Sequence, residues 1–383
     1  MIEKVWNPEK IEDRLQLQAI QRRRPLSCFF ELTYRCNFHC KMCYIRMTDA
    51  QAAQYGRMRT VEEWLDMARQ LYDAGVLYLT LTGGECTHYP GFEKLYEQLA
   101  QMGFRLSLMS NAGAYSDSLR SLFTRYPPYG VAVTLYGGSN ETYETVTGDP
   151  KGLDKVINNI RFFQSIGVPV RLNFTMIRQN ALDYPKVGQL CMELGIPYTL
   201  LTDITSHQHD ASFSEALACR LSPAERACVA CHPPEEVALG LENAKELEKE
   251  LTHFQMPTAP AEPPAPQMDA CIGSMTECAI SWNGEMYTCI SMKGYHSVSP
   301  FEIGFDAAWA QLKAEHEATF RRPTVCQSCG MAKDCLHNCA ARRFEGTGSP
   351  HEPDPYTCQY TYLLRLYKGR RKVADIPPPP SCV

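Results

Sequence analysis

The sequence is short of features that would place the protein in a special class. No stretch approaches the ~20 consecutive apolar residues that a membrane helix needs. The first residues, Met1–Asn7, have no basic start followed by an apolar run, so no secretory signal is predicted. Charge is balanced, because 38 Lys and Arg stand against 43 Asp and Glu and give a net charge of −5. We therefore expect a cytoplasmic protein that is neither a membrane protein nor a general nucleic-acid binder.

The sequence is rich in cysteine. The 383 residues otherwise have an ordinary globular composition, 44% apolar and 21% charged, which excludes disorder, collagen and coiled coil for the whole chain. There are 18 cysteines. Structural disulfides are rare in a reducing compartment, so we expect metal ligands or redox groups. At ~150 residues per domain, the length favours two domains or one large α/β barrel with an appendage.

From Cys28 to about Asp203, strand-like and helix-like segments alternate. The predicted strands are Cys28–Thr33, Val76–Thr82, Phe104–Ser110, Val131–Tyr136, Val168–Met176 and Tyr198–Thr202. The predicted helices are Val61–Ala74, Phe92–Met102, Asp117–Arg125, Leu153–Ile166 and Tyr184–Leu194. This alternation predicts a parallel sheet covered by helices. Six units are fewer than the eight of a closed barrel, so we predict an α/β fold, a partial (β/α)6 TIM-like barrel, with its working face at the carboxyl ends of the strands.

The rest of the chain is divided by composition. We interpret residues 1–27 as a polar N-terminal lead-in, residues 28–203 as the partial barrel and residues 204–268 as a connector. The connector holds one charged, exposed helix (Pro234–His253) and a Pro/Ala-rich linker (Met256–Met268). Residues 269–372 are predicted to form a small Cys-rich domain with a β-hairpin and short helices. Residues 373–383 are Pro-rich and are predicted to form a tail.

Two motifs follow the first two predicted strands. Cys36, Cys40 and Cys43 have the spacing C-x₃-C-x₂-C. Three thiolates can hold a small cubic iron–sulfur cluster and leave one iron open; the alternative is a zinc site completed by His39 or a distant residue. Gly83–Glu85 (Gly-Gly-Glu) ends the second strand. Glycines let the backbone approach closely and a carboxylate complements an ammonium, although a tight turn would also explain the motif.

Together these motifs resemble radical S-adenosylmethionine (SAM) enzymes. The resemblance implies that Cys36, Cys40 and Cys43 ligate a [4Fe–4S] cluster whose open iron binds the amine and carboxylate of SAM. Reductive cleavage of SAM then gives methionine and a 5′-deoxyadenosyl radical, which abstracts hydrogen from a substrate. It also implies that Gly83, Gly84 and Glu85 hold the methionine amine, and that Met42 contacts adenine.

Other residues at the strand ends are candidates for the same site. Six could face the ribose, carboxylate or adenine of SAM, with ordinary packing as the alternative for each: Ser110, Asn111, Thr134, Tyr136, Asn173 and Thr175. Cys86 stands where the family often has proline. It is the candidate catalytic thiol that would return a hydrogen atom to a substrate radical, and a small apolar filler is the alternative.

A second cysteine array occupies the C-terminal region. Its eight members are Cys271, Cys278, Cys289, Cys326, Cys329, Cys335, Cys339 and Cys358. Ala279–Cys289 is predicted to be a β-hairpin that turns at Asn283 and Gly284. Eight thiolates could bind two zinc ions or two cubic clusters, and spacing alone does not separate these.

The array resembles the SPASM extension of radical SAM enzymes. Cys271-x₁₂-Gly284-x₄-Cys289, the following four-cysteine run and the final cysteine match its pattern. The resemblance implies two auxiliary [4Fe–4S] clusters, hence three clusters in all. One would be held by Cys271, Cys278, Cys289 and Cys339. The other would be held by Cys326, Cys329, Cys335 and Cys358. If Cys278 is not a ligand, the first auxiliary cluster has an open iron that could bind substrate.

Other cysteines remain outside these sets. Cys28 and Cys191 fall in strand and helix patterns and are expected to be buried. Cys228 and Cys231 could be a metal or redox pair, but we favour a loop because no second pair stands beside them. No role is predicted for Cys219.

The substrate prediction depends on resemblance. Leu135–Gly148 looks like a stretch common in peptide-modifying SPASM proteins, which favours a ribosomally made peptide as substrate. The outcome would be a thioether or carbon–carbon crosslink or an epimerisation, with an external one-electron reductant such as flavodoxin or ferredoxin. Alternatives are a sulfatase maturase, which Ile290 after Cys289 disfavours, a radical enzyme acting on a small molecule, and a non-enzymatic zinc scaffold.

Overall fold

The computed structural model describes residues 10–206, 214–260, 271, 273–335 and 339–370. The predicted tail and residues 261–268 of the predicted linker lie outside the described residues. Among the described helices, none combines the length and apolar character needed to cross a membrane.

A sheet of eight strands forms the centre of the fold, in the order β6-β5-β4-β3-β2-β1-β7-β8. The strands are β1 (Ser27–Glu31), β2 (Tyr78–Thr82), β3 (Arg105–Ser110), β4 (Gly130–Leu135), β5 (Val170–Thr175), β6 (Tyr198–Leu201), β7 (Glu277–Ile280) and β8 (Met286–Tyr287). The first six run parallel in chain order. The predicted open, partial barrel of α/β class is confirmed.

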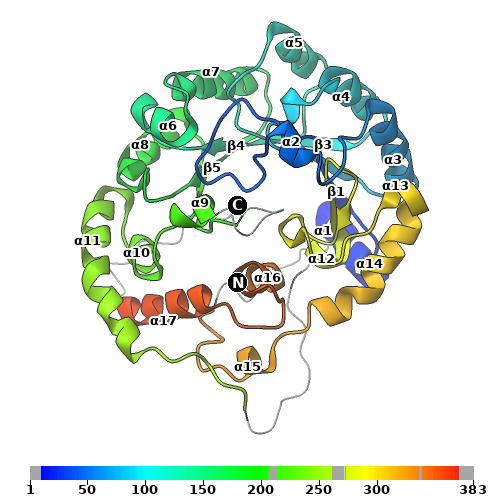
Figure 1. Cartoon of the computed structure of the whole chain (residues 1–383). Coiled ribbons are helices and arrows are strands. Elements are labelled where there is room, and N and C mark those ends of the chain that lie inside the picture. Colours follow the sequence, from blue (N-terminus) through cyan, green and yellow to red (C-terminus); the bar gives the residue numbers. More distant parts are fainter. Residues whose placement is uncertain (1–9, 207–213, 261–270, 272, 336–338, 371–383) are drawn as a thin grey trace.

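Helices connect the strands and cover the sheet. The five predicted ones are α3 (Val61–Asp73), α4 (Phe92–Gln101), α5 (Asp117–Arg125), α7 (Gly152–Ser165) and α8 (Tyr184–Leu194). Thr60 accepts a hydrogen bond from the backbone N–H of Glu63 and so fixes the start of α3. A further helix, α6 (Asn140–Thr147), begins at the N-cap Ser139. Figure 1 shows α3, α4, α5, α7 and α8 outside the strands, in a ring that α11, α17 and α14 complete.

The predicted hairpin is present, but it belongs to the main sheet. β7 and β8 are antiparallel neighbours, and β7 pairs in parallel with β1, with Ser27 opposite Glu277 and Cys28 opposite Cys278. Without β7, one edge of β1 would present unpaired backbone groups. The sequence pattern of a hairpin indicates only that β7 and β8 pair with each other. The pairing of β7 with β1, about 250 residues away in the chain, was therefore not predicted.

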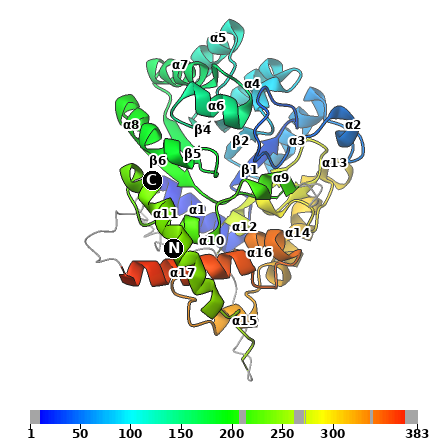
Figure 2. The same ribbon diagram turned by 60° about the vertical axis from the view of Figure 1, so that its left-hand side comes forward.

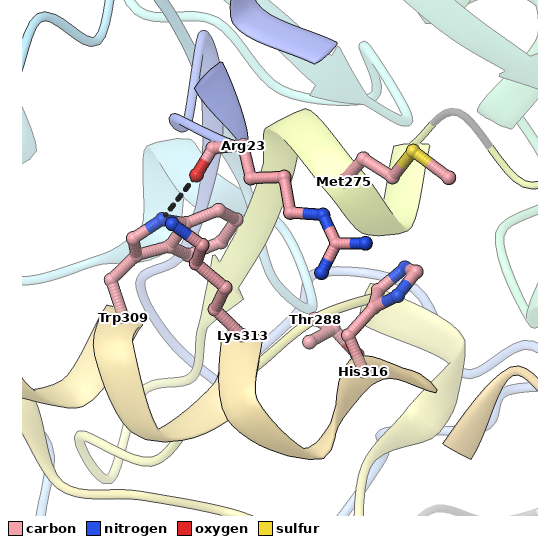
Figure 3. Close-up of a pocket in the computed structure, with 6 residues that line it drawn as sticks. All are labelled: Arg23, Met275, Thr288, Trp309, Lys313 and His316. Carbon is pink, nitrogen blue, oxygen red and sulfur yellow. Dashed lines mark hydrogen bonds between the residues drawn. The ribbon is translucent and has the colours of Figure 1, made fainter. Parts of the chain in front are cut away.

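The N-terminal lead-in differs from its prediction. Residues Ile11–Arg22 form helix α1. At its end, Trp309 of α14 (Phe305–Thr319) donates its indole N–H to the carbonyl of Arg23 at 3.1 Å, as Figure 3 shows. The backbone N–H of Leu26 donates to the carbonyl of Thr276 at 2.7 Å. The helix was missed because it has no side-chain N-cap and its apolar pattern is weak.

The connector contains a second apolar core instead of an isolated exposed helix. α10 (Pro223–Val229), α11 (Val237–Glu248) and α17 (Pro355–Arg370) pack together, and α10 and α11 lie beside α17 in Figure 1 and Figure 2. Cys228 and Cys231 are fully buried in this core, the first inside α10 rather than in a loop. The C-terminal region was predicted to hold only short helices, but α14 has 15 residues and α17 has 16.

The remaining helices are short. They are α2 (Asp49–Ala52), α9 (Ser214–Ala218), α12 (Gly273–Thr276), α13 (Pro300–Ile303), α15 (Thr324–Gln327) and α16 (Ala340–Thr347). Single 3₁₀ turns are found at Cys86–His88, Ala181–Asp183, Pro234–Glu236, Lys249–His253 and Ile290–Met292. Of these elements, α16 positions side chains at the cavity described next.

Candidate active site

A cavity of about 670 Å³ lies at the carboxyl ends of the parallel strands. The cysteines of the first motif line it, together with nine further residues named from the sequence: Cys36, Cys40, Cys43, Met42, Gly83, Gly84, Ser110, Asn111, Thr134, Tyr136, Asn173 and Thr175. Parallel strands bring their carboxyl ends to one edge of the sheet, which explains why residues far apart in sequence meet here.

The three cysteines of the first motif form one electrostatic group. Burial raises the pKa of Cys36 to about 12, and the thiol of Cys43 adds to the shift. Burial also raises the pKa of Cys40, with Cys43 and Cys36 as the next causes. Thiolates crowded in a poorly solvated site are unfavourable alone, whereas a cationic metal centre stabilises them. The donor set therefore fits an iron–sulfur cluster.

Polar neighbours surround the sulfurs of Cys36 and Cys40. The side-chain amide of Asn111 donates to Sγ of Cys36 at 3.3 Å, and the backbone N–H of Phe38 donates to the same atom at 3.4 Å. Tyr136 lies beside Cys40, and its pKa is raised by burial and then by the Cys40 and Cys36 thiols. Asn111 and Tyr136 thus belong to the environment of the sulfurs as well as to the cavity wall.

The arrangement differs from a site for one metal ion. Across the described residues, no three Cys, His, Asp or Glu side chains stand close enough to share a single ion. Thiols that ligate different irons of a cubic cluster stand further apart than the ligands of one ion. His39, the zinc ligand considered from the sequence, is exposed and does not line the cavity.

The two sequence motifs are bonded to each other through their backbones. The N–H of Gly84 donates to the carbonyl of Thr33 at 2.7 Å, and the N–H of Glu85 donates to that of Arg35 at 2.8 Å. A Cβ on Gly84 would lie 2.4 Å from the Arg35 oxygen, and Gly83 has φ +141°. Both glycines are therefore required by close approach and backbone conformation.

Glu85 lies behind the cavity wall and is not one of its lining residues. Its side chain is 1% exposed and accepts hydrogen bonds from the Ser110 hydroxyl at 2.9 Å, the Asn111 backbone N–H at 2.8 Å and the Thr87 hydroxyl at 2.9 Å. The carboxylate is thus engaged by the end of β3 and by its own turn. We interpret it as a positioning residue for Ser110 and Asn111.

Cys86 is also away from the cavity. Its thiol is fully buried, lies 3.8 Å from the Met109 carbonyl, and is not among the lining residues. Burial raises its pKa, and the neighbouring Glu85 carboxylate raises it further. A hydrogen donor to a substrate radical must reach the substrate, so this position favours the packing alternative.

The remaining part of the cavity wall, which we call the opposite wall, comes from residues after β8 and from α16, and it contains charged residues that the sequence did not single out. Lys293 lines the cavity and forms an ion pair with Glu31 at 2.8 Å, with each side chain only 3% exposed. Buried ion pairs are tightly constrained, because removing one partner leaves an uncompensated charge. No motif marks Lys293; the only signal was its place four residues after a predicted ligand, Cys289.

Glu345 of α16 lines the same wall. It accepts a hydrogen bond from the backbone N–H of Ser206 at 2.5 Å and pairs with Arg342 at 3.3 Å. Burial raises the pKa of Glu345 to about 7, against the lowering effect of Arg342. A carboxyl group with a pKa near neutrality, facing a cavity, can accept or hold a proton.

The C-terminal cysteines include two sets of neighbouring thiols. Burial raises the pKa of Cys358 to about 12, and the neighbouring Cys326, Cys335 and Cys329 thiols contribute. In the other group, the pKa of Cys289 rises to about 12 through burial, with Cys339 and Cys271 as neighbouring thiols.

Cys278 is placed differently from the other candidate ligands of that first group. It is fully buried on β7, where its Cα pairs with that of Cys28 on β1.

Comparison with known proteins accounts for this arrangement. Residues 30–186 match the family described as the Radical SAM superfamily. The chain is 26% identical over 191 residues to the sporulation killing factor maturation protein SkfB of Bacillus subtilis (strain 168), a match covering 50% of this chain and 45% of SkfB. It is 24% identical over 172 residues to the antilisterial bacteriocin subtilosin biosynthesis protein AlbA of the same organism, covering 45% of this chain and 38% of AlbA. The chain thus matches less than half the length of these curated relatives.

A solved structure extends the likeness in fold. Streptococcus suis SuiB bound to S-adenosylmethionine has a TM-score of 0.60 to this chain, with 16% identity, covering 94% of this chain and 82% of SuiB. SuiB bound to the precursor peptide SuiA matches equally well, with a TM-score of 0.60. The shared fold includes the region after the barrel. Residues 30–186 of this chain are therefore assigned to a radical SAM domain.

Proposed function

We propose that this chain is a radical SAM enzyme that modifies a ribosomally made peptide. The observation that carries the proposal is the meeting of Cys36, Cys40 and Cys43 with the strand-end residues on one cavity. We also propose that the chain is divided into a radical SAM partial barrel (residues 28–203) and a SPASM-type domain (residues 269–372).

The first motif would hold the SAM-binding [4Fe–4S] cluster. When bound, that cluster supplies the electron that cleaves SAM to methionine and a 5′-deoxyadenosyl radical, which takes a hydrogen atom from the substrate. Gly84 and Glu85 keep the second strand end close to the cysteine loop through their backbone hydrogen bonds, and Gly83 allows this close approach. The strand-end residues and Met42 would bind the rest of SAM, and Asn111 would orient the sulfur of Cys36.

The opposite wall would receive the substrate. Pockets for small ligands are typically ~300–1,000 Å³, so the cavity of about 670 Å³ has room for SAM while its far wall stays available. Lys293 and Glu345 give that wall one cationic and one acidic group. Such groups can bind peptide backbone or side chains, and Glu345 can accept a proton from a substrate.

The relatives support a peptide as the substrate class. SkfB is described as a maturation protein for the sporulation killing factor and AlbA as a biosynthesis protein for the bacteriocin subtilosin, and SuiB has been solved with a precursor peptide. The helix α6 lies in the stretch that resembles peptide-modifying proteins. We propose a thioether or carbon–carbon crosslink, or an epimerisation, as the outcome. An external one-electron reductant such as flavodoxin or ferredoxin would support turnover.

The test begins with SAM. Anaerobically purified protein, reduced with dithionite, should cleave SAM to 5′-deoxyadenosine. With a candidate precursor peptide, mass spectrometry should then detect the loss of two hydrogens for a crosslink, or chiral amino-acid analysis should detect a D-residue for an epimerisation. Absence of 5′-deoxyadenosine from an iron-replete protein would contradict the radical mechanism. SAM cleavage without change to any precursor peptide would contradict the substrate class alone.

A further inference from the structure

The hairpin turn between β7 and β8 is bonded to a residue that lies 224 positions earlier in the chain. This residue is Arg59, which stands between the first cysteine motif and helix α3. Its guanidinium donates to the backbone carbonyl of Asn283 from Nη2 at 2.8 Å and from Nε at 3.1 Å. Its backbone N–H donates to the carbonyl of Trp282 at 3.0 Å. Arg59 therefore holds the turn through both its side chain and its backbone.

Two further contacts fix the Arg59 side chain. Nη1 lies 3.3 Å from the carboxylate of Glu63 in α3, and Cζ lies 4.6 Å from the ring centroid of Phe301 in α13. Helices α3 and α13 lie side by side in both ribbon views (Figure 1 and Figure 2). The Arg59 side chain is only 19% exposed. A planar guanidinium with this many partners is held in one orientation.

Gly284 leaves the space that this guanidinium occupies. A Cβ on Gly284 would lie 2.6 Å from Nη2 and 2.7 Å from Cζ of Arg59, closer than such atoms approach in folded proteins. Gly284 also has φ +92°, a conformation that residues with a side chain rarely adopt. The turn glycine is thus required by the neighbouring Arg59 side chain as well as by its own backbone.

The hairpin turn also packs against the loop that carries the first cysteine motif. Trp282 is fully buried, and its ring centroid lies 4.9 Å from that of Tyr34. A small apolar core surrounds this contact, and its buried members are Tyr34, Ile45, Ala52 and Trp282. Cys43 packs against the same core. Because protein cores are closely packed, a displacement of Trp282 is passed on to the cysteine loop.

The same hairpin leads into the opposite wall of the cavity. Lys293 follows β8, and its Nζ lies 5.9 Å from the ring centroid of Trp282. It pairs with Glu31, the last residue of β1. The hairpin is thus connected to both walls of the cavity, and the contact with Arg59 fixes its position. Neither Arg59 nor Gly284 lines the cavity itself.

We propose that Arg59 is a positioning residue of the SAM site and that it acts through the hairpin turn and Trp282. The guanidinium holds the turn at Asn283, and Trp282 then supports the loop that would carry the SAM-binding cluster. Gly284 is required because it leaves room for the guanidinium. The proposal rests on the proposed function in assigning that loop to the SAM-binding cluster. It extends that function by making the affinity for SAM depend on a residue outside the cavity.

The first experiment measures SAM binding by the full-length, iron-replete protein. Misplacement by about 1 Å can cost on the order of 10²-fold at a reacting centre, and for this indirect contact we expect Arg59→Ala to raise the dissociation constant of SAM by about 10-fold. Equilibrium dialysis with labelled SAM measures this change, and the iron content should equal that of the wild type. An unchanged SAM affinity in iron-replete Arg59→Ala would restrict the residue to a role in local stability and overturn the proposal.

The conservative variant provides a second measurement. Arg59→Lys keeps a cationic donor for the Asn283 carbonyl but loses the planar fork, so it should recover part of the affinity that Arg59→Ala loses. If Arg59→Ala fails to retain iron, the Lys variant and the glycine variant described next decide the question. Wild-type affinity for SAM in both of these variants would overturn the proposal.

A double variant tests the role assigned to Gly284. Gly284→Ala should displace the guanidinium and raise the dissociation constant of SAM by about 10-fold in the wild-type background. In the Arg59→Ala background, the same substitution should change that constant by less than about twofold, because the contact is already absent. Gly103→Ala is the matched control, since Gly103 has φ +88° and nothing lies within 4 Å of a Cβ there. Equal effects of Gly284→Ala in both backgrounds, or an equal effect of Gly103→Ala, would attribute the loss to backbone strain and overturn the proposal.

EPR spectroscopy reports on the cysteine loop directly. The difference between spectra of the dithionite-reduced protein with and without saturating SAM isolates the cluster that SAM approaches. We expect this difference spectrum to change in Arg59→Ala and Gly284→Ala and to stay as in the wild type in Gly103→Ala. A wild-type difference spectrum in the first two variants would overturn the proposal. If the wild-type protein itself shows no response to SAM, the proposed function fails instead, so the two failures are distinguishable.

Discussion

The two walls of the cavity differ in how the chain builds them. The strand-end wall comes from residues that immediately follow consecutive parallel strands, and short motifs mark it. The opposite wall comes from residues 290, 291, 293 and 294, which follow β8, and from residues 344, 345 and 348 in and after α16. These residues meet only after β7 joins β1 and α16 folds inside the ring. The difference teaches that the proposed cofactor side is encoded locally, while the proposed substrate side depends on long-range packing. Substitutions on the two walls should therefore have different consequences.

The largest effect is expected at the first motif. Cys40→Ala removes one of the three thiols that line the cavity, and it should abolish production of 5′-deoxyadenosine and lower iron content by ~4 Fe per chain. Cys191→Ala is the control, because Cys191 is buried in α8 and away from the cavity. Wild-type rates of SAM cleavage in the Cys40 variant would refute the assignment of this wall to the cofactor.

A second effect on the same wall should follow from Gly84→Ala. The new Cβ would stand 2.4 Å from the carbonyl oxygen of Arg35, so the second strand end must move away from the cysteine loop. Misplacement by about 1 Å can cost on the order of 10²-fold in rate, and we expect SAM cleavage to slow by about 10- to 100-fold. Gly130→Ala in β4, whose Cβ would meet its nearest atom at 3.6 Å, should have little effect. Equal rates for both variants would show that the close approach is not required.

On the opposite wall, Lys293→Met should act through stability. The substitution leaves Glu31 buried without its partner, and breaking a buried pair costs about 3–5 kcal/mol. Chemical denaturation of the holoprotein measures this loss, and the double variant Lys293→Met with Glu31→Gln should recover part of it. The exposed pair of Lys94 and Glu62, 2.7 Å apart, is the control, since removing such a pair costs less than about 1 kcal/mol. A similar loss of unfolding free energy on breaking the Lys293–Glu31 pair and the Lys94–Glu62 pair would contradict the structural importance of the buried pair.

The smallest effect is expected from Glu345→Gln. The folded-state pKa of Glu345 is raised to about 7 from 4.5, so the folded protein binds the proton more tightly than the unfolded chain. Its contribution to stability is greatest at low pH and is lost as pH rises through 7. Between pH 6 and 8, the free energy of unfolding of the wild type should fall by about 1 kcal/mol more than that of the Gln variant. Thermal midpoints of both proteins at the two pH values measure this difference. SAM cleavage without substrate should persist in this variant, and its loss would place Glu345 on the cofactor side instead.

The sequence was most informative where structure is local. Strand and helix limits of the barrel agree with the prediction within one or two residues, because alternating apolar patterns and glycines at helix ends are short-range signals. The strand-end candidates converge for the same reason: in a parallel sheet the order of the strands is enough to bring Ser110, Thr134 and Asn173 to one edge.

The sequence was least informative where contacts are distant. Nothing in residues 10–25 indicates that α1 packs beside α12 and α14, and nothing in Lys293 indicates that Glu31 is its partner. Glu85 shows the same limit, since its motif predicts a ligand for an ammonium while the structure has its carboxylate accepting hydrogen bonds from Ser110, Asn111 and Thr87. Pairings between segments hundreds of residues apart depend on the packing of the whole chain.

The sequence by itself determined the partial barrel, the position of its working face and the two groups of cysteines, because period, spacing and turn chemistry act over a few residues. The tertiary structure alone decided which residues after β8 and in α16 complete the cavity, and that Cys278 pairs with Cys28 across two strands. Those features follow from the pairing of β7 with β1 and from the docking of α16, which bring together chain segments that have no local signal for one another.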